Sequence, residues 1–230
     1  MRRVAALLLA GLVSCGGSDG GGGSDGGCTG GCAVASPVAL TVPEVQRIIS
    51  QAVQEAQARG AGATIAVVDR VGNVLAVFQM TGAAPTFTIS GGRGVAGGLE
   101  LQGMNIVPSE FAAISKAVTG AYLSSEGNAF TTRTASQIVQ QNFNPGEIGS
   151  PGGPLFGVQF SQLPCSDLSR RVSGGAADAG PKRSPLGLAA DSGGLPLYLA
   201  GTPVGGIGVI ADGVYGLDAN AGDIDADLDE

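Results

Sequence analysis

Two segments of this 230-residue chain each place two strand-forming runs on either side of a short glycine turn, and they constrain its fold most strongly. In the first segment, the runs Thr64–Asp69 and Val74–Met80 flank a Gly-Asn turn. In the second, Leu195–Leu199 and Pro203–Ala211 flank a turn that contains Gly201. Such turns join antiparallel strands, so both segments predict β-hairpins. The first hairpin is almost continuously apolar, which predicts that both of its faces are covered.

Periodic apolar residues predict helices around these hairpins. Thr41 and Glu44 have the spacing of a capping box, and apolar side chains recur at helical spacing from Pro43 to Arg59. A second helix is predicted over Ser109–Leu123, with Ser109 as its cap, and a shorter one over Thr132–Phe143. Two further short strands are predicted, Pro85–Ile89 and Pro154–Phe160. The pattern is that of an α/β (α+β) domain with a mainly antiparallel sheet and packed helices.

The first 15 residues predict an export signal and a lipid anchor. A cationic start precedes the apolar run Val4–Val13, which is too short to cross a bilayer but suits the core of a secretory signal, residues 1–14. The run ends in Leu-Val-Ser-Cys, which resembles a bacterial lipobox with Cys15 as the lipid acceptor. Several acyl chains on Cys15 would hold the protein firmly at the membrane. An ordinary signal followed by an incidental cysteine is the alternative.

Glycine separates the anchor from the domain. Ten of the 41 glycines fall within Gly16–Cys32, where there are almost no side chains to bury. Residues 15–37 therefore predict a flexible tether that carries a domain over residues 38–230. Within that domain, residues 144–190 or thereabouts predict an insertion. The acidic residues from Asp218 to Glu230 predict the solvated start of a helix.

Composition excludes several classes of function. The net charge of −7 offers no basic stripe for a nucleic-acid partner. The absence of histidine excludes histidine-ligated haem, histidine-containing zinc sites and Ser-His-Asp triads. With Cys15 assigned to lipid, three cysteines remain. Cys28 can pair with Cys32, or one of these two can link to Cys165, and both pairings stay open.

The order of these elements resembles the GlcG/HbpS-like family, also seen as the C-terminal domain of PduO-type proteins. The resemblance spans roughly Val42–Gly213 and depends on the runs TIAVVDRVGNVLAVFQMTGA, ISKAVTGAYL and GGLPLYLAGTPVGGIGVIADG. It implies a profilin-like sandwich, often oligomeric, that in some members binds haem or a related tetrapyrrole. This chain departs from the family in its long segment before the second hairpin and in its lack of histidine. It also ends at Asp-Leu-Asp-Glu, where family members continue into a closing helix, so that helix is either cut short or small.

Haem binding without histidine requires another axial ligand and cations for the propionates. Tyr122 is the first candidate ligand, since tyrosinate suits ferric iron, and its predicted helix also holds Lys116 as a partner for a propionate. Met80 is a second candidate ligand and Arg93 a second cation. Each has an ordinary alternative: a packed tyrosine, a core methionine and two solvated charges.

The sequence therefore predicts an exported, lipid-anchored protein of the bacterial cell envelope that binds a small molecule, haem or a related tetrapyrrole, and forms a homo-oligomer. No nucleophile and base can be paired convincingly, so no catalytic residue is predicted. Two alternatives stay open. One is an enzyme or enzyme accessory that acts on a small organic acid or cofactor, and the other is a structural, oligomerising module of the cell surface.

Mass spectrometry of the mature protein tests the predicted anchor. We expect Cys15 to be the first residue and to be acylated, because its thiol accepts the lipid and cleavage occurs directly before it. An unmodified amino terminus beyond Cys15 would contradict the prediction.

Overall fold

The computed structural model describes residues 38–90, 103–140, 149–158, 160–162, 166, 168, 184–217 and 228–230. All of them belong to the second of two compact units, Pro37–Glu230. The elements in chain order are α1 (Val42–Ala58), β1 (Thr64–Asp69), β2 (Val74–Gln79), β3 (Thr86–Ser90), β4 (Val107–Pro108), α2 (Ser109–Leu123), α3 (Thr132–Ile138), β5 (Gly194–Leu199), β6 (Thr202–Ile210) and β7 (Val214–Gly216). Among the described residues, no helix is long and apolar enough to span a membrane. The predicted mixed fold of helices on mainly antiparallel sheets is confirmed.

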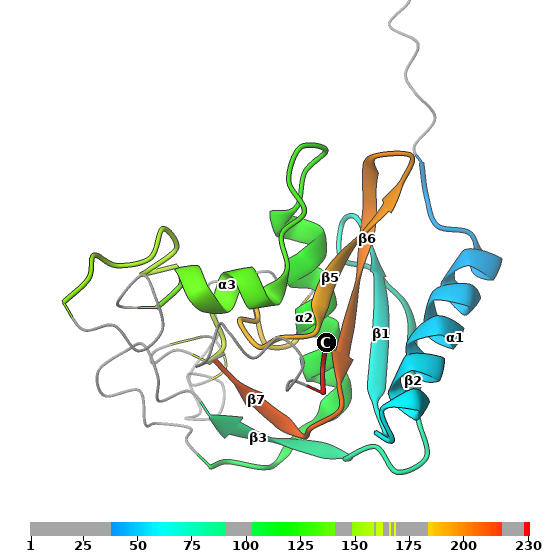
Figure 1. Cartoon of the computed structure of the whole chain (residues 1–230), viewed down its shortest axis with the longest axis horizontal. Coiled ribbons are helices and arrows are strands. Elements are labelled where there is room, and N and C mark those ends of the chain that lie inside the picture. Colours follow the sequence, from blue (N-terminus) through cyan, green and yellow to red (C-terminus); the bar gives the residue numbers. More distant parts are fainter. Residues whose placement is uncertain are drawn as a thin grey trace, which may run out of the picture. The chain divides into compact units, whose positions relative to one another are not determined.

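Both predicted hairpins form, and they join in one four-stranded sheet of order β2-β1-β6-β5 (Figure 1). All three pairings are antiparallel. Ile207 of β6 lies at the centre, opposite Val67 of β1 on one side and Leu195 of β5 on the other. The two hairpins therefore contribute one half of the sheet each.

The helices α1 and α2 pack on opposite faces of this sheet. Along β1, Ile65 and Val67 join the apolar cluster beneath α1, whereas Ala66 and Val68 join the cluster around α2. This alternation follows from the period of two in a strand. Because both faces are covered here, β1 is a continuous apolar run. At the start of α1, the predicted capping box forms between Thr41 and Glu44.

Small residues let α2 approach β6 closely. A Cβ atom at Gly206 would overlap the carbonyl oxygen of Ala117, and one at Gly208 would overlap that of Ala113. Gly120 of α2 in turn faces the backbone of Leu195. Every residue of α2 from Ala112 to Ala121 is consequently buried. The glycines of β6 thus serve close packing rather than turn formation.

A second, smaller sheet of order β4-β3-β7 completes the described domain. The predicted strand at Pro85–Ile89 exists as β3, but it pairs with β4 and, in parallel, with β7 instead of extending the main sheet. Phe87 and Tyr215 pack ring against ring there, with centroids 4.8 Å apart. The two- and three-residue strands β4 and β7 are too short to be evident in a sequence pattern.

Four details of the predicted helices and strands are wrong. The first hairpin is not covered on both sides. Val74, Leu75, Val77 and Phe78 of β2 are each 40–45% exposed, because neither α1 nor α2 extends over this edge strand. Residues 154–158, within the predicted strand Pro154–Phe160, form turns instead, and Phe160 makes only an isolated bridge to Leu188.

The other two errors concern helix ends. The third helix ends at Ile138 instead of Phe143. Ser109 is the first residue of α2 rather than its cap, and its hydroxyl donates to the carbonyl of Ala84. The loop Gly91–Gly103 that holds Arg93, and most of the predicted insertion and acidic tail, lie outside the described residues.

The close packing of α2 on β6 predicts that Gly206→Ala destabilises the protein. The added methyl group has no space beside Ala117, so we expect the free energy of unfolding to fall by about 1–3 kcal/mol. Gly127→Ala is the control, since a Cβ atom there meets nothing within 4 Å. Urea unfolding followed by circular dichroism measures both changes. Equal stabilities of the two variants would show that α2 does not need this approach.

Candidate functional site

A groove opens on the α1 face of the sheet because α1 covers only half of that face. The helix packs mainly over β1, reaches β2 only at Ala76, and leaves β5 and β6 uncovered beside it. The resulting space has a volume of about 420 Å³. It is lined by Ile48, Gln51, Ala52, Glu55, Ala56, Arg59, Leu195, Leu197, Ile207, Val209, Leu228, Asp229 and Glu230.

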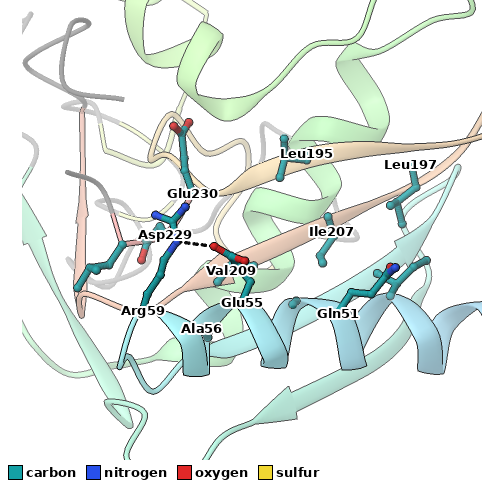
Figure 2. Close-up of a pocket in the computed structure, with 13 residues that line it drawn as sticks. Gln51, Glu55, Ala56, Arg59, Leu195, Leu197, Ile207, Val209, Asp229 and Glu230 are labelled. Carbon is teal, nitrogen blue, oxygen red and sulfur yellow. Dashed lines mark hydrogen bonds and ion pairs between the residues drawn. The ribbon is translucent and has the colours of Figure 1, made fainter. Parts of the chain in front are cut away.

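The groove is apolar along its length and charged at one end. Leu195 and Leu197 of β5, with Ile207 and Val209 of β6, face α1 across the space (Figure 2). The charged end is formed by the last turns of α1 and by the C-terminal residues. There Glu55 and Arg59 form an i,i+4 ion pair of 2.9 Å. Glu230 pairs with Arg133 of α3 at 2.5 Å.

Behind this end, the ammonium group of Lys116 is completely buried. It lies 2.6 Å from Asp191 Oδ2, forms a second ion pair with Asp229, and donates to the carbonyl oxygen of Val209 at 2.8 Å. Two carboxylates and one carbonyl oxygen thus surround the ammonium group. We call Lys116, Asp191 and Asp229 the buried ion cluster.

The two carboxylates connect the cluster to the surrounding backbone. Asp191 Oδ1 accepts the amide of Gly216 in β7 at 2.6 Å. Asp229 Oδ1 accepts the amides of Ala211 and Asp212, directly after β6. The cluster therefore joins α2, the end of β6, β7 and residues 228–230. It also fixes Asp229 at the edge of the groove.

Burial and the neighbouring charges shift the pKa values of Lys116 and Asp191. Burial on its own would lower the pKa of Lys116, but the two neighbouring carboxylates outweigh it and raise that pKa above its ordinary value. Burial raises the pKa of Asp191 well above its ordinary value. Asp229 adds to this effect, and Lys116 offsets only part of it. On acidification, we expect the cluster to take up a proton at Asp191.

All three tyrosine hydroxyls have partners within the protein. Tyr122 donates to the carbonyl of Val71 in the β1–β2 turn at 3.0 Å. Tyr198 donates to the carbonyls of Ser125 and Asn128. Tyr215 shares a 2.5 Å hydrogen bond with Ser161, and burial raises its pKa above the ordinary value. These contacts give each tyrosine a structural role.

The predicted site residues do not meet in one site: Lys116 lies in the buried ion cluster, and Tyr122 lies at the β1–β2 turn. Tyr122 and Lys116 both lie on α2, as predicted. Met80 packs in the apolar cluster on the opposite, α1 face of the sheet. None of these three lines the groove, and Arg93 lies outside the described residues. The proposed haem contacts of these residues remain predictions.

Two charged residues are buried where the sequence predicts solvated charges. Lys116 has no exposed surface, and Asp229 is only 4% exposed. A lysine surrounded by Ala112, Ala113 and Ala117 is a sequence signal for burial, because a solvated helix face normally has further polar residues. For Asp229 no local signal exists, since its partner is 113 positions away.

A protein-family model matches residues 40–90, described as "Haem degrading protein HbpS-like". The match runs from α1 to β3 and covers less than a quarter of the chain. It includes all of α1, which forms one wall of the groove. No curated protein matches the sequence.

Several solved structures are distantly similar. A PduOC:haem complex is 20% identical, with 75% of this chain and 83% of that chain covered and a TM-score of 0.43. The Klebsiella pneumoniae protein ORFY is 18% identical over 76% and 81%, with a TM-score of 0.44. A double mutant of Streptomyces reticuli HbpS is 21% identical over 79% and 81%, with a TM-score of 0.42. At these values, the similarities carry no conclusion about ligand or activity.

The buried ion cluster predicts a pH-dependent cost for Lys116→Met. Removing the cation leaves two buried carboxylates unpaired, so we expect a loss of about 3–5 kcal/mol at neutral pH. The pKa of Asp191 is already raised in the folded protein, and without Lys116 it rises further. The folded variant then binds a proton that the unfolded chain releases, so its stability increases as the pH falls through that pKa.

Urea unfolding at about pH 7.5 and about pH 5 measures this effect, with exposed Arg47→Met as the control. The double variant Lys116→Met/Asp191→Asn is expected to recover part of the loss. A loss that is the same at both pH values would contradict the assignment of the pH dependence to Asp191.

Proposed function

We propose that this chain is a small-ligand-binding protein that holds a tetrapyrrole of the haem class in the groove between α1 and β5–β6. The observation that carries the proposal is the groove itself, an apolar space of about 420 Å³ with one charged end. Small-molecule sites commonly have this size and this mixture of apolar walls and few polar groups. The match of residues 40–90 to the HbpS-like haem-degrading family supports the choice of ligand class.

The described lining of the groove provides apolar contacts for the ring of a tetrapyrrole but no ligand for its iron. The aliphatic side chains of β5 and β6 face α1 across the space, and this arrangement suits a flat apolar molecule. Among the described lining residues there is no tyrosine, methionine or cysteine to coordinate iron. The acidic residues Glu55, Asp229 and Glu230 already pair with cations. We therefore expect binding to depend on contacts with the ring, without coordination of the iron by the protein.

The same lining favours binding over the alternative of an enzyme. The described residues of the groove include no serine, threonine, lysine, tyrosine or cysteine. They therefore offer no hydroxyl, thiol or amine nucleophile to a bound molecule. Arg59 is the cation on the lining, and it can meet one acidic group of the ligand by exchanging its contact with Glu55.

Export and anchoring form part of the same proposal. The short apolar run before Leu12-Val13-Ser14-Cys15 and the glycine-rich residues that follow support an acylated protein on a tether at the bacterial cell envelope. In that position, the protein would hold its ligand close to the membrane.

Titration with haemin and with metal-free protoporphyrin IX tests the proposed ligand class. The protein must be untagged, since a histidine tag would supply an iron ligand that the sequence lacks. We expect both compounds to bind with micromolar dissociation constants that differ by less than about threefold, because the contacts are made to the ring. Absorbance and fluorescence changes give both constants.

A matched pair of variants locates the site. Leu195 in the groove and Leu75 on β2 are both 41% exposed and lie on the two edge strands of one sheet. Leu195→Gln is expected to weaken binding about tenfold, because an apolar contact of roughly 50 Å² is lost. Leu75→Gln is expected to leave it unchanged. Equal effects of the two changes, or no binding of either compound, would refute the proposed function.

A further inference from the structure

The edge strand β2 exposes more large apolar side chains than the other three strands of the four-stranded sheet. Within the described part of the chain, β2 pairs only with β1, so its other edge is open. Its six residues, Val-Leu-Ala-Val-Phe-Gln, include no charge, no proline and no glycine. Four of them are large apolar residues that are 40–45% exposed. This is the largest run of exposed apolar residues in the described strands.

An open edge offers unpaired backbone amides and carbonyls to another strand, and proteins normally protect such edges. The opposite edge of the same sheet is protected. There β5 contains Pro196, which has no amide proton, and Tyr198 is bonded to the loop after α2. On β2, a bulge affects only the turn end, near Val74, and the pairing from Ala76 to Gln79 is regular. Two unlike edges in one sheet indicate that the β2 edge has a partner.

We propose that the partner is a second copy of this chain, whose β2 pairs antiparallel with β2 of the first to form one eight-stranded sheet. A strand edge is self-complementary about a two-fold axis, which is the symmetry of most homodimers. The strand is uncharged, so two copies of an acidic chain do not repel each other at this edge.

The side chains of β2 fit this arrangement on both faces. Phe78 pairs with Ile65, which packs under α1, and so Phe78 lies on the α1 face. Val77 pairs with Ala66, which packs around α2, and so Val77 lies on the other face. In a symmetric pair, each apolar residue would meet apolar residues of the second copy on its own face. Both exposed surfaces of the strand would then be covered.

The size of the contact sets the strength of the dimer. Stable interfaces bury about 800 Å² on each partner. One six-residue strand with exposed Val71 of the adjoining turn supplies less than that, so we expect a dissociation constant on the order of 10 µM. The groove lies over β5 and β6, away from the β2 edge. The inference therefore stands independently of the proposed ligand.

Sedimentation velocity of the full chain from about 1 to about 200 µM tests the dimer, across the expected dissociation constant. All proteins carry Cys15→Ser, so that a lipid does not contribute to association. We expect the wild-type edge to show a monomer–dimer equilibrium and Val77→Lys to weaken it at least tenfold, because a charge enters the interface. Ile106→Lys is the control, since Ile106 is 68% exposed and lies outside the four-stranded sheet. It is expected to associate like the wild type.

Hydrogen exchange gives a second readout that needs no variant. The amide of Met80 donates to Ala63 within the sheet, so the alternating amides of Val77 and Gln79 point to the open edge. We expect their protection to rise with protein concentration, while that of Met80 stays the same. A monomer at about 200 µM, association that survives Val77→Lys, or unprotected amides in the associated protein would each overturn the proposal.

Discussion

The burial of Lys116 between α2 and the sheet is the interaction on which the rest of the structure depends. A buried ammonium is costly unless partners surround it, and here Asp191, Asp229 and the carbonyl of Val209 do so. These partners come from three separate parts of the chain. Their backbone contacts extend the cluster to β7 and to the residues after β6. The same contacts bring the C-terminal residues to the end of the groove.

The unequal cover of the sheet explains where the two proposed surfaces lie. On one face α1 lies mainly over β1, which leaves β2 largely exposed on one side and the groove over β5 and β6 on the other. On the other face α2 packs closely on β6 through its glycines and does not shield β2. Each helix is thus displaced toward a different half of the sheet. A ligand site and a self-association edge can therefore coexist without competing for the same residues.

Local sequence patterns predicted the helices and strands, whereas contacts between distant residues determine the exposure of β2, the groove and the buried ion cluster. The hairpins, α1 and α2 were evident because alternation, helical spacing and a capping box involve residues close in sequence. The exposure of β2 was not, since an apolar run looks the same whether or not a helix covers it. The groove and the buried ion cluster were also missed. Asp229 meets Lys116 only after the chain has folded, and aliphatic lining residues resemble any core.

We propose that a tetrapyrrole binds to the α1 face of the sheet through apolar contacts. Mapping amide chemical shifts by NMR during titration of the labelled protein with protoporphyrin IX tests it most directly. We expect the largest shifts along Ile48–Arg59 of α1 and Leu195–Val209 of β5 and β6. Shifts centred instead on Tyr122 and the β1–β2 turn would contradict it, since these residues lie outside the groove.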